Sequence, residues 1–237
     1  MRGRFGAILA ELRSHAPFTL FGAVTGILAM LLFVRAPGAT SLRLFQVFHP
    51  THVVLSAIVT ASLFRLHEKK TGFLIVLLVG YVGAIGTATL SDCVLPFFGE
   101  SMLGVAVPTE AAEHGQQAGP AHADEPDAAG GPQIHLGFIE EWYVVNPSAL
   151  LGILIAWFWP RTKFPHAGHI LISTWASAAH IMMNMQGGLT ILTAIGAFCV
   201  LFVAVWVPCC SSDIVVPLLF VRSPHLHVGH EHPVEAT

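Results

Sequence analysis

The chain has 237 residues and a formal net charge of −3, and charged residues make up only 11% of it, where a soluble domain carries about 25%. Because 54% of the residues are hydrophobic and the mean hydropathy is +0.69, we expect an all-α integral membrane protein in contact with the lipid bilayer. The negative net charge excludes the basic surface of a protein that binds nucleic acid.

Six stretches of the chain are long and apolar enough to predict transmembrane helices. A spanning helix needs about 20 mostly apolar residues, because lipid offers the backbone no hydrogen-bond partners. The six stretches are residues 17–34, 45–64, 72–90, 144–159, 170–185 and 188–207. Residues 1–16 place apolar and basic side chains on different sides of a helix, which predicts an amphipathic helix on the cytoplasmic membrane surface. An ordinary cytoplasmic lead-in fits the same pattern.

Two shorter apolar segments, 93–107 and 214–221, follow the third and the sixth predicted span. Each contains a proline and lies beside an aspartate, and each is too short to cross the membrane alone, so we predict re-entrant or interfacial segments. Residues 108–134 lack Lys and Arg and are rich in Ala, Gly, Pro and acidic residues, which predicts a disordered outer linker. This linker and the tail 223–237 contain histidines that favour loose metal binding, although simple solvated segments fit equally well.

The placement of Lys and Arg predicts how the chain is oriented. With the N-terminus inside, nine of the 11 Lys and Arg residues face the cytoplasm, and only Arg35 and Arg43 lie outside. Cytoplasmic loops carry such an excess of positive charge. We therefore predict a multi-pass protein of the plasma (inner) membrane with both termini in the cytoplasm.

The two halves of the chain carry the same motifs in the same order. An H-x-x-H pattern begins at His49 and again at His166, and an S-D-x-V-x-P pattern begins at Ser91 and again at Ser212. A Gly-Ile-Leu match precedes the H-x-x-H pattern in both halves. Paired histidines and Ser-Asp motifs in the same order indicate an internal repeat.

The first repeat covers residues 17–107 and the second covers residues 135–222. Each holds three predicted spans, an odd number, so the second repeat must enter the membrane upside down relative to the first. Inverted repeats of this kind are typical of secondary transporters, which bind their substrate near the repeat interface. Duplication for packing alone explains the same pattern in a membrane protein that transports nothing.

The histidine pairs are candidate metal ligands. Residues three apart share one face of a helix, and zinc and similar divalent transition metals bind imidazole, carboxylate and thiolate groups. The candidate ligands are His49, His52, Asp92, Cys93, His166, His169, His180, Cys209, Cys210 and Asp213. Structural roles fit the same residues: a neutral histidine can bond to water or carbonyl groups at the membrane interface, and the aspartates can cap the short apolar segments.

Three functions follow from these patterns. The first is a small transporter for a divalent transition metal such as zinc, which we expect to act as a homodimer or within a membrane complex. The second is an integral-membrane metalloenzyme with one shared metal centre. The third is a non-catalytic subunit or scaffold. A proton-coupled carrier of an organic or anionic substrate would use similar His and Asp pairs.

The expected separation of the two H-x-x-H motifs favours the transporter over the enzyme. The motifs begin helices from opposite faces of the membrane, so we expect them to lie about 20–30 Å apart. A single shared metal centre requires them to meet. The zinc-protease motif H-E-x-x-H, the Walker A loop and the G-x-S-x-G elbow are all missing from the sequence, which also argues against those enzyme classes.

Overall fold

The computed structural model describes residues 2–33, 38–104, 136–160, 163–184 and 189–220, excluding the side chains at 2–12, 14, 38–39, 163–166, 184 and 210–220. Every element within these ranges is a helix. In chain order the helices are α1 (Arg2–Phe33), α2 (Gly38–His67), α3 (Phe73–Ala88), the π-helix η1 (Thr89–Val94), α4 (Leu95–Met102), α6 (Gly137–Glu140), α7 (Trp142–Phe158), α8 (Lys163–Asn184) and α9 (Ile191–Phe220). The all-α prediction is therefore confirmed for the described residues.

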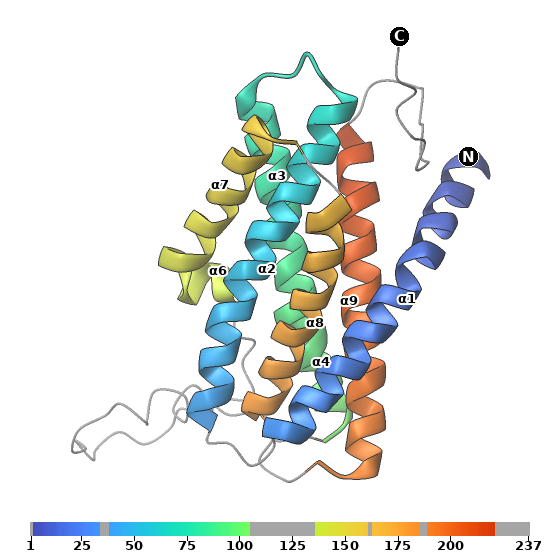
Figure 1. The fold of residues 1–237 in the computed structure, drawn as a ribbon, viewed down its shortest axis with the longest axis vertical. Coiled ribbons are helices and arrows are strands. Elements are labelled where there is room, and N and C mark those ends of the chain that lie inside the picture. The colour runs from blue at the N-terminus through green and yellow to red at the C-terminus, as the bar shows by residue number, and fades with distance from the viewer. Residues whose placement is uncertain (1, 34–37, 105–135, 161–162, 185–188, 221–237) are drawn as a thin grey trace, which may run out of the picture.

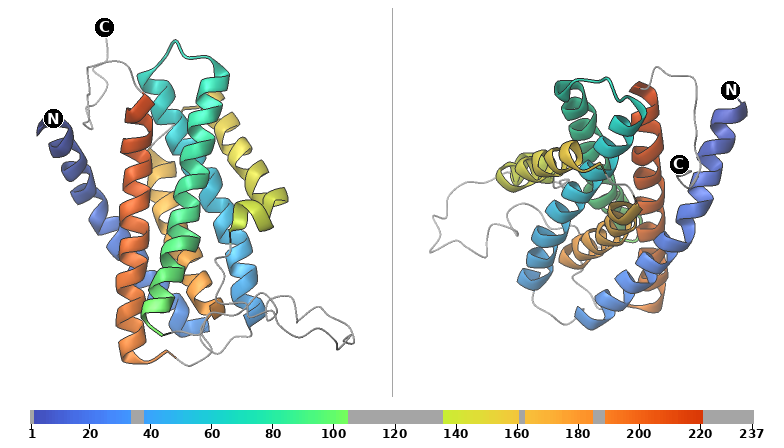
Figure 2. Two further views of the ribbon diagram at one scale, coloured as in Figure 1. Left: turned by 180° about the vertical axis from the view of Figure 1, so that it is seen from behind. Right: turned by 45° about the horizontal axis from the view of Figure 1, so that its top comes forward.

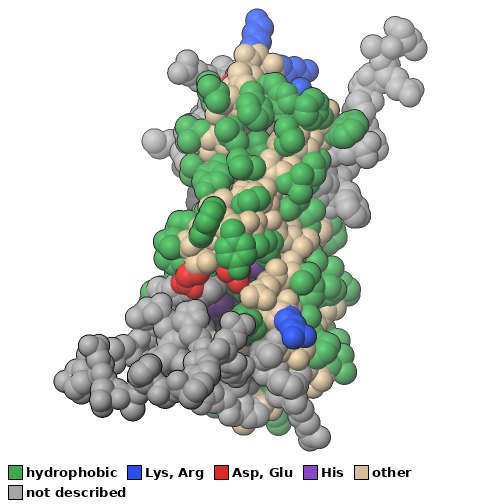
Figure 3. Space-filling model, turned by 90° about the vertical axis from the view of Figure 1, so that its left-hand side faces the viewer, with side chains coloured by type: hydrophobic (Ala, Val, Ile, Leu, Met, Phe, Trp, Pro, Cys, Tyr) green, Lys and Arg blue, Asp and Glu red, His purple; other side chains and the backbone are tan. Residues whose placement is uncertain are grey.

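Four helical stretches are long and apolar enough to cross a membrane: His15–Phe33, Thr40–His67, Phe73–Met102 and Ile191–Cys209. The helix Trp142–Phe158 is apolar but shorter, and α8 carries several His, Ser and Thr residues among its apolar ones. Large hydrophobic side chains cover the outside of the bundle, where Leu32 is 79% exposed and Ile191 is 82% exposed, and one such face is visible in Figure 3. These features fit a membrane-embedded protein, whereas a count of six spans stays a prediction.

Two helices continue through segments that the sequence analysis separates from them. The third span runs on through η1 and α4 to Met102 as one apolar helical stretch, and α9 is helical as far as Phe220. The described parts of 93–107 and 214–221 are therefore extensions of spanning helices and not independent re-entrant segments. Likewise α1 is continuous from Arg2, so residues 2–16 are not a separate helix. The linker 108–134 and the tail 223–237 lie outside the described residues.

Successive long helices run in alternating directions along the bundle (Figures 1 and 2). The fourth long helix, α7, runs opposite to the first, α1, as an inverted repeat requires. The beginning of α1 and the end of α9 lie at the same end of the bundle, together with the connection between α2 and α3. We call the opposite end, where α4 lies, the α4 end.

Two apolar clusters hold the bundle together, and each takes helices from both halves of the chain. The first cluster joins α2, α3 and α7 through Ala57, Ala61, Phe64, Val76, Val79, Ala84, Ile153 and Ala156. The second joins α1, α8 and α9 through Ala23, Met30, Ala178, Ile181, Ala197 and Leu201. Exchanging the corresponding helices of the two repeats converts the first set of helices into the second. The middle helices, α2 and α8, pack against each other between the clusters.

Two glycines at corresponding sequence positions face the middle helices, but only one of them makes a close contact. A Cβ atom on Gly152 of α7 would lie 2.7 Å from the Cβ of Ala57 on α2, and one on Gly26 of α1 would lie 3.5 Å from the Cγ2 of Thr174 on α8. Both glycines begin the Gly-Ile-Leu matches, and Ala57 and Thr174 each follow the first histidine of their motif by eight residues. The two positions correspond in the sequence, whereas a Cβ contact of 2.7 Å excludes a side chain at Gly152 and one of 3.5 Å at Gly26 is an ordinary van der Waals contact.

Candidate functional site

Asp92 lies where the third span changes its helical pitch. Pro96 has no N–H group and cannot bond to the carbonyl of Asp92 four residues earlier. The chain around Asp92 forms the π-helix η1, in which the N–H of Leu95 donates to the carbonyl of Leu90. Wide helical turns of this type occur often at functional sites. The S-D-x-V-x-P motif thus contains both the buried aspartate and the proline that favours the irregular turn.

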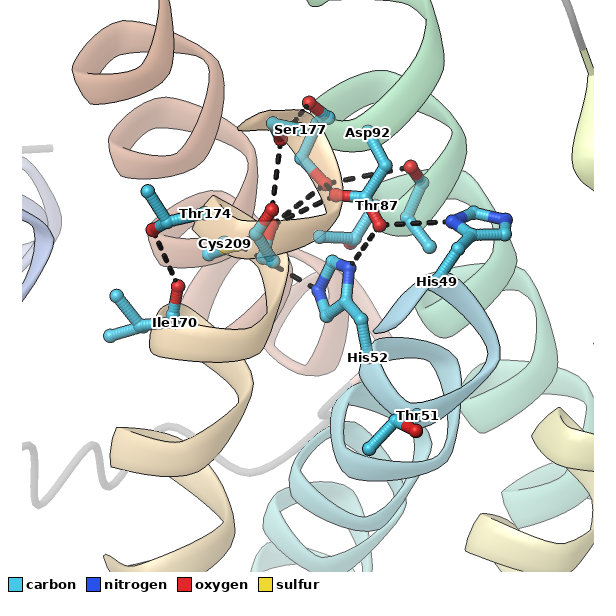
Figure 4. Close-up of polar contacts among 12 residues, drawn as sticks. His49, Thr51, His52, Thr87, Asp92, Ile170, Thr174, Ser177 and Cys209 are labelled. Carbon is cyan, nitrogen blue, oxygen red and sulfur yellow. Dashed lines mark hydrogen bonds and ion pairs between the residues drawn. The ribbon is translucent and has the colours of Figure 1, made fainter. Parts of the chain in front are cut away.

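The Asp92 carboxylate is the centre of a buried hydrogen-bond network (Figure 4). Its Oδ2 atom lies 2.9 Å from the Nδ1 of His49 and 2.7 Å from the Nδ1 of His52. Its Oδ1 atom accepts hydrogen bonds from the hydroxyl groups of Ser91 at 2.7 Å and Ser173 at 2.9 Å. Four bonds use the full acceptor capacity of an ionised carboxylate. Because such an oxygen only accepts, both imidazoles donate from Nδ1.

The two H-x-x-H motifs meet in the middle of the bundle. The rings of His52 and His169 stack with their centroids 5.9 Å apart and an interplanar angle of 6°. The expected separation of about 20–30 Å is therefore wrong. That expectation assumed that each motif lies at the start of its helix, whereas α2 begins at Gly38 and His52 lies halfway along α2. Both rings are also fully buried, which excludes the interfacial role for these two histidines.

The Nε2 atoms of the central imidazoles point away from Asp92 toward two other elements. The Nε2 of His52 lies 4.0 Å from the Sγ of Cys209 on α9. The Nε2 of His49 faces α6, where a Cβ on Gly137 would lie only 2.7 Å away. A histidine that ligates a metal usually gives its second ring nitrogen to a carboxylate, which fixes the tautomer and the ring orientation. The Asp92 contacts therefore fix the ring orientation of both imidazoles and leave each Nε2 atom turned away from the carboxylate.

A second buried pair lies nearer the α4 end. The Nδ1 of His180 on α8 is 2.9 Å from the Oε1 of Glu100 on α4. Glu100 is fully buried and His180 is 3% exposed. The ring of Phe45 stacks on His49 at a centroid distance of 5.0 Å and meets His180 edge-on at 5.6 Å. His180 is therefore not part of the central group, although it follows His169 by 11 residues, about three helical turns, and so lies on the same face of α8.

The other predicted ligands have different positions. Cys93 is buried in an apolar cluster with Phe45 and Ala179. The side chains of His166, Cys210 and Asp213 lie outside the described ones. Asp92 does not cap α4, because the N-cap position is Val94 and no side chain caps that helix. Among the described side chains, no group of three or more His, Cys, Asp or Glu residues is gathered as a ready metal site.

Several site residues were missed by the sequence analysis. Ser91 and Ser173 stand within the repeated motifs, so their position next to the aspartate and the histidines was a usable signal. Ser177 extends this group, because its hydroxyl donates to the carbonyl of Ser91 at 2.9 Å. Glu100 also carried a signal, since an acidic residue in an apolar membrane segment is costly and usually functional. Phe45 carried none, because a phenylalanine in a spanning helix is ordinary.

Comparisons with known proteins add no assignment. No family model matches the chain, and neither a curated protein nor a solved structure is significantly similar to it. The functional argument therefore depends on the site itself.

Proposed function

We propose that this protein is a small inverted-repeat transporter for a divalent transition metal ion such as zinc. The ion binds between the two halves, at His52 from the first repeat and at His169 and Cys209 from the second. One observation carries the proposal. Asp92 holds the Nδ1 of His52 at 2.7 Å, and the Nε2 of the same ring lies 4.0 Å from the Cys209 sulfur.

The distance between these two atoms suits one zinc ion. Zinc lies about 2.0–2.1 Å from an imidazole nitrogen and about 2.3 Å from a thiolate sulfur, so a single ion reaches both atoms across 4.0 Å. The stacked ring of His169 supplies the next imidazole. The described side chains do not yet surround one point, so the ion completes its coordination when the two halves shift against each other, as alternating access requires.

The packing of the helices supports the inverted repeat on which this mechanism depends. The two apolar clusters take equivalent helices, and α7 runs opposite to α1. The two middle helices meet at His52 and His169, which occupy the same place in their motifs. A substrate site at this junction is accessible to either side when the repeats rock, because each repeat contributes one wall.

The repeat also predicts a counterpart of the Asp92 network. Ser173 donates to Asp92, and the equivalent serine of the first repeat is Ser56, which stands four residues after the second histidine of its motif. The Ser56 hydroxyl is buried and has no hydrogen-bond partner within the described part of the chain. The equivalent of Asp92 is Asp213. We therefore expect Ser56 to donate to Asp213 in at least one state of the transport cycle.

Transport by the purified full chain in liposomes tests the proposed function. Radioactive zinc uptake is compared between the wild type, His52→Gln and the matched control His67→Gln. His67 lies at the end of α2, and within the described residues its side chain bonds only to the Leu63 carbonyl. We expect His52→Gln to lower the initial rate about tenfold or more and His67→Gln to leave it within about twofold. Equal rates for the wild type and both variants would contradict the proposal.

A second candidate function is an integral-membrane metalloenzyme with its centre at the same histidines. The contact between His52 and His169 removes the distance argument against it. An enzyme of this kind retains a stoichiometric metal through purification, whereas a carrier releases its cargo. A stoichiometric metal found by elemental analysis of the purified chain, together with the absence of zinc uptake, would favour the enzyme.

We further propose that the chain is a homodimer in the plasma (inner) membrane with both termini cytoplasmic. The connection between α2 and α3 carries Lys69 and Lys70 and lies at the same end as the beginning of α1, which fits an excess of positive charge on the cytoplasmic side. The substitutions Lys69→Cys and Ser101→Cys, each made separately, test the orientation of the chain in the membrane of intact cells. A membrane-impermeant thiol reagent should label position 101 and not position 69, and labelling of position 69 alone would reverse the orientation. Cross-linking tests the dimer.

A further inference from the structure

A buried glutamate–histidine pair lies outside the central network. Glu100 and His180 are hydrogen-bonded at 2.9 Å, and both side chains are withdrawn from solvent. Buried ionisable groups in membrane segments are costly, and they commonly mark ion or substrate pathways. The pair comes from α4 and α8, and the same two helical stretches, α3–η1–α4 and α8, also supply Asp92 and Ser173 to the central network. Both polar groups therefore lie along one interface of the bundle.

An apolar layer separates the two polar groups. Phe45, Cys93 and Ala179 form one buried cluster, and the Phe45 ring contacts His49 on one side and His180 on the other. Glu100 follows Asp92 by eight residues, so at the α-helical rise of 1.5 Å per residue their backbone positions are at most about 12 Å apart along the helix axis. The interface thus alternates between a polar layer, an apolar layer and a second polar layer.

The second pair is not explained by the internal repeat. Counted from the H-x-x-H motif, His180 aligns with Leu63 in the other half, and counted from the S-D-x-V-x-P motif, Glu100 aligns with Val221. Both counterparts are apolar. A fold made only by duplication would carry this pair in both halves or in neither. The pair makes the α4 end of the bundle chemically different from the opposite end.

We propose that Glu100 and His180 form a second binding site for a divalent transition metal ion, on the α4 side of the central site, and that Phe45 closes the direct route between the two sites. This inference rests on the proposed transport function. Zinc binds imidazole nitrogen and carboxylate oxygen at about 2.0–2.2 Å, so one ion reaches both atoms of the pair when it displaces the proton that they share, and that proton is released to solvent. Two ligands from the described side chains hold the ion weakly, which suits a transient stop on a path that the ion must leave again.

Equilibrium binding of zinc to the detergent-solubilised full chain tests the second site. The double variant Glu100→Val/His180→Leu replaces the pair with the apolar residue types that stand at the corresponding positions, 221 and 63, of the other half. The matched control is Glu140→Gln, because Glu140 is an exposed glutamate on α6. We expect the double variant to bind one zinc ion fewer than the control at saturation. A double variant that binds as many ions as the control, with the same affinities, would overturn the inference.

A second pair of substitutions separates this inference from the proposed function. His52→Gln/Cys209→Ser removes central ligands, and its loss of zinc should add to the loss caused by Glu100→Val/His180→Leu. Suppose that His52→Gln/Cys209→Ser binds as many zinc ions as the control while Glu100→Val/His180→Leu binds fewer. The central site is then wrongly assigned, and the second site stands.

Zinc uptake into liposomes tests whether Phe45 closes the direct route between the two sites. The control is Phe45→Leu, which keeps the layer apolar. We expect Phe45→Ala to raise the initial uptake rate severalfold over Phe45→Leu. Equal rates for the two variants would overturn the role of Phe45.

Discussion

Replacing Asp92 with asparagine should lower stability and change the tautomer of two histidines. The carboxylate accepts four hydrogen bonds in the structure. A hydrogen bond to a charged group contributes about 1.5–3 kcal/mol and a neutral one about 0.5–1.5 kcal/mol. The difference is about 1 kcal/mol for each bond, or roughly 4 kcal/mol in all. For a chain of this size we expect Tm to fall by roughly 8–16 °C.

A flipped asparagine amide, with its oxygen at the position of Oδ2, would leave both tautomers unchanged. With its nitrogen there, the amide donates where the carboxylate accepted, so His49 and His52 accept at Nδ1 and carry their proton on Nε2. That change removes the Nε2 lone pair from metal binding, and zinc affinity should fall by roughly 10–100-fold. Thermal unfolding in detergent measures the change in Tm. Nitrogen NMR of histidine-labelled protein identifies the tautomers of His49 and His52. Glu140→Gln is the control, because the Glu140 side chain is exposed. If Asp92→Asn melts within 2 °C of that control and both imidazoles keep their proton on Nδ1, the assignment of Asp92 is refuted.

Two further predictions concern glycines at close contacts. Gly152→Ala should lower the free energy of unfolding by about 1–3 kcal/mol, because the added Cβ meets the α2 backbone and Ala57 in a packed interface. The control Gly86→Ala meets no atom within 4 Å and should be neutral or slightly stabilising, so equal melting temperatures for the two variants would contradict the close approach of α7 and α2. Gly137→Ala places a Cβ 2.7 Å from the Nε2 of His49 and should destabilise the protein by a similar amount; an unchanged Tm would mean that α6 does not cover this imidazole.

The sequence predicted the helical class correctly because composition and the length of apolar runs determine whether backbone groups can be satisfied in lipid. It also named His52, His169 and Asp92 as candidates, because ionisable residues stand out in apolar segments, and the structure brings these three together. The helix limits were less predictable. Hydropathy marks the apolar part of a helix and not its ends, so α2 begins at Gly38 and not at residue 45. This error placed the two H-x-x-H motifs at opposite membrane faces.

The grouping of the site residues depended on information that one sequence lacks. His180 lies on the same stripe as His169 by helical spacing, yet its partner is Glu100, because α4 passes beside the far end of α8. The wide turn of η1 also changes the side to which residues before and after it point. Regular helical periodicity cannot predict contacts across such a turn. The serines around Asp92 were identifiable as motif members, whereas their hydrogen bonds required the packing of α8 against η1.

X-ray absorption at the zinc edge tests most directly whether both halves of the chain bind one ion. The full chain is loaded with one equivalent of zinc and compared with Cys209→Ser and with Cys199→Ser, a substitution of an exposed cysteine. We predict a mixed shell of nitrogen at about 2.0–2.1 Å and sulfur at about 2.3 Å, with the sulfur contribution lost in Cys209→Ser and retained in Cys199→Ser. A shell without sulfur in the wild type, or an identical spectrum for both variants, would contradict a metal site shared between the repeats.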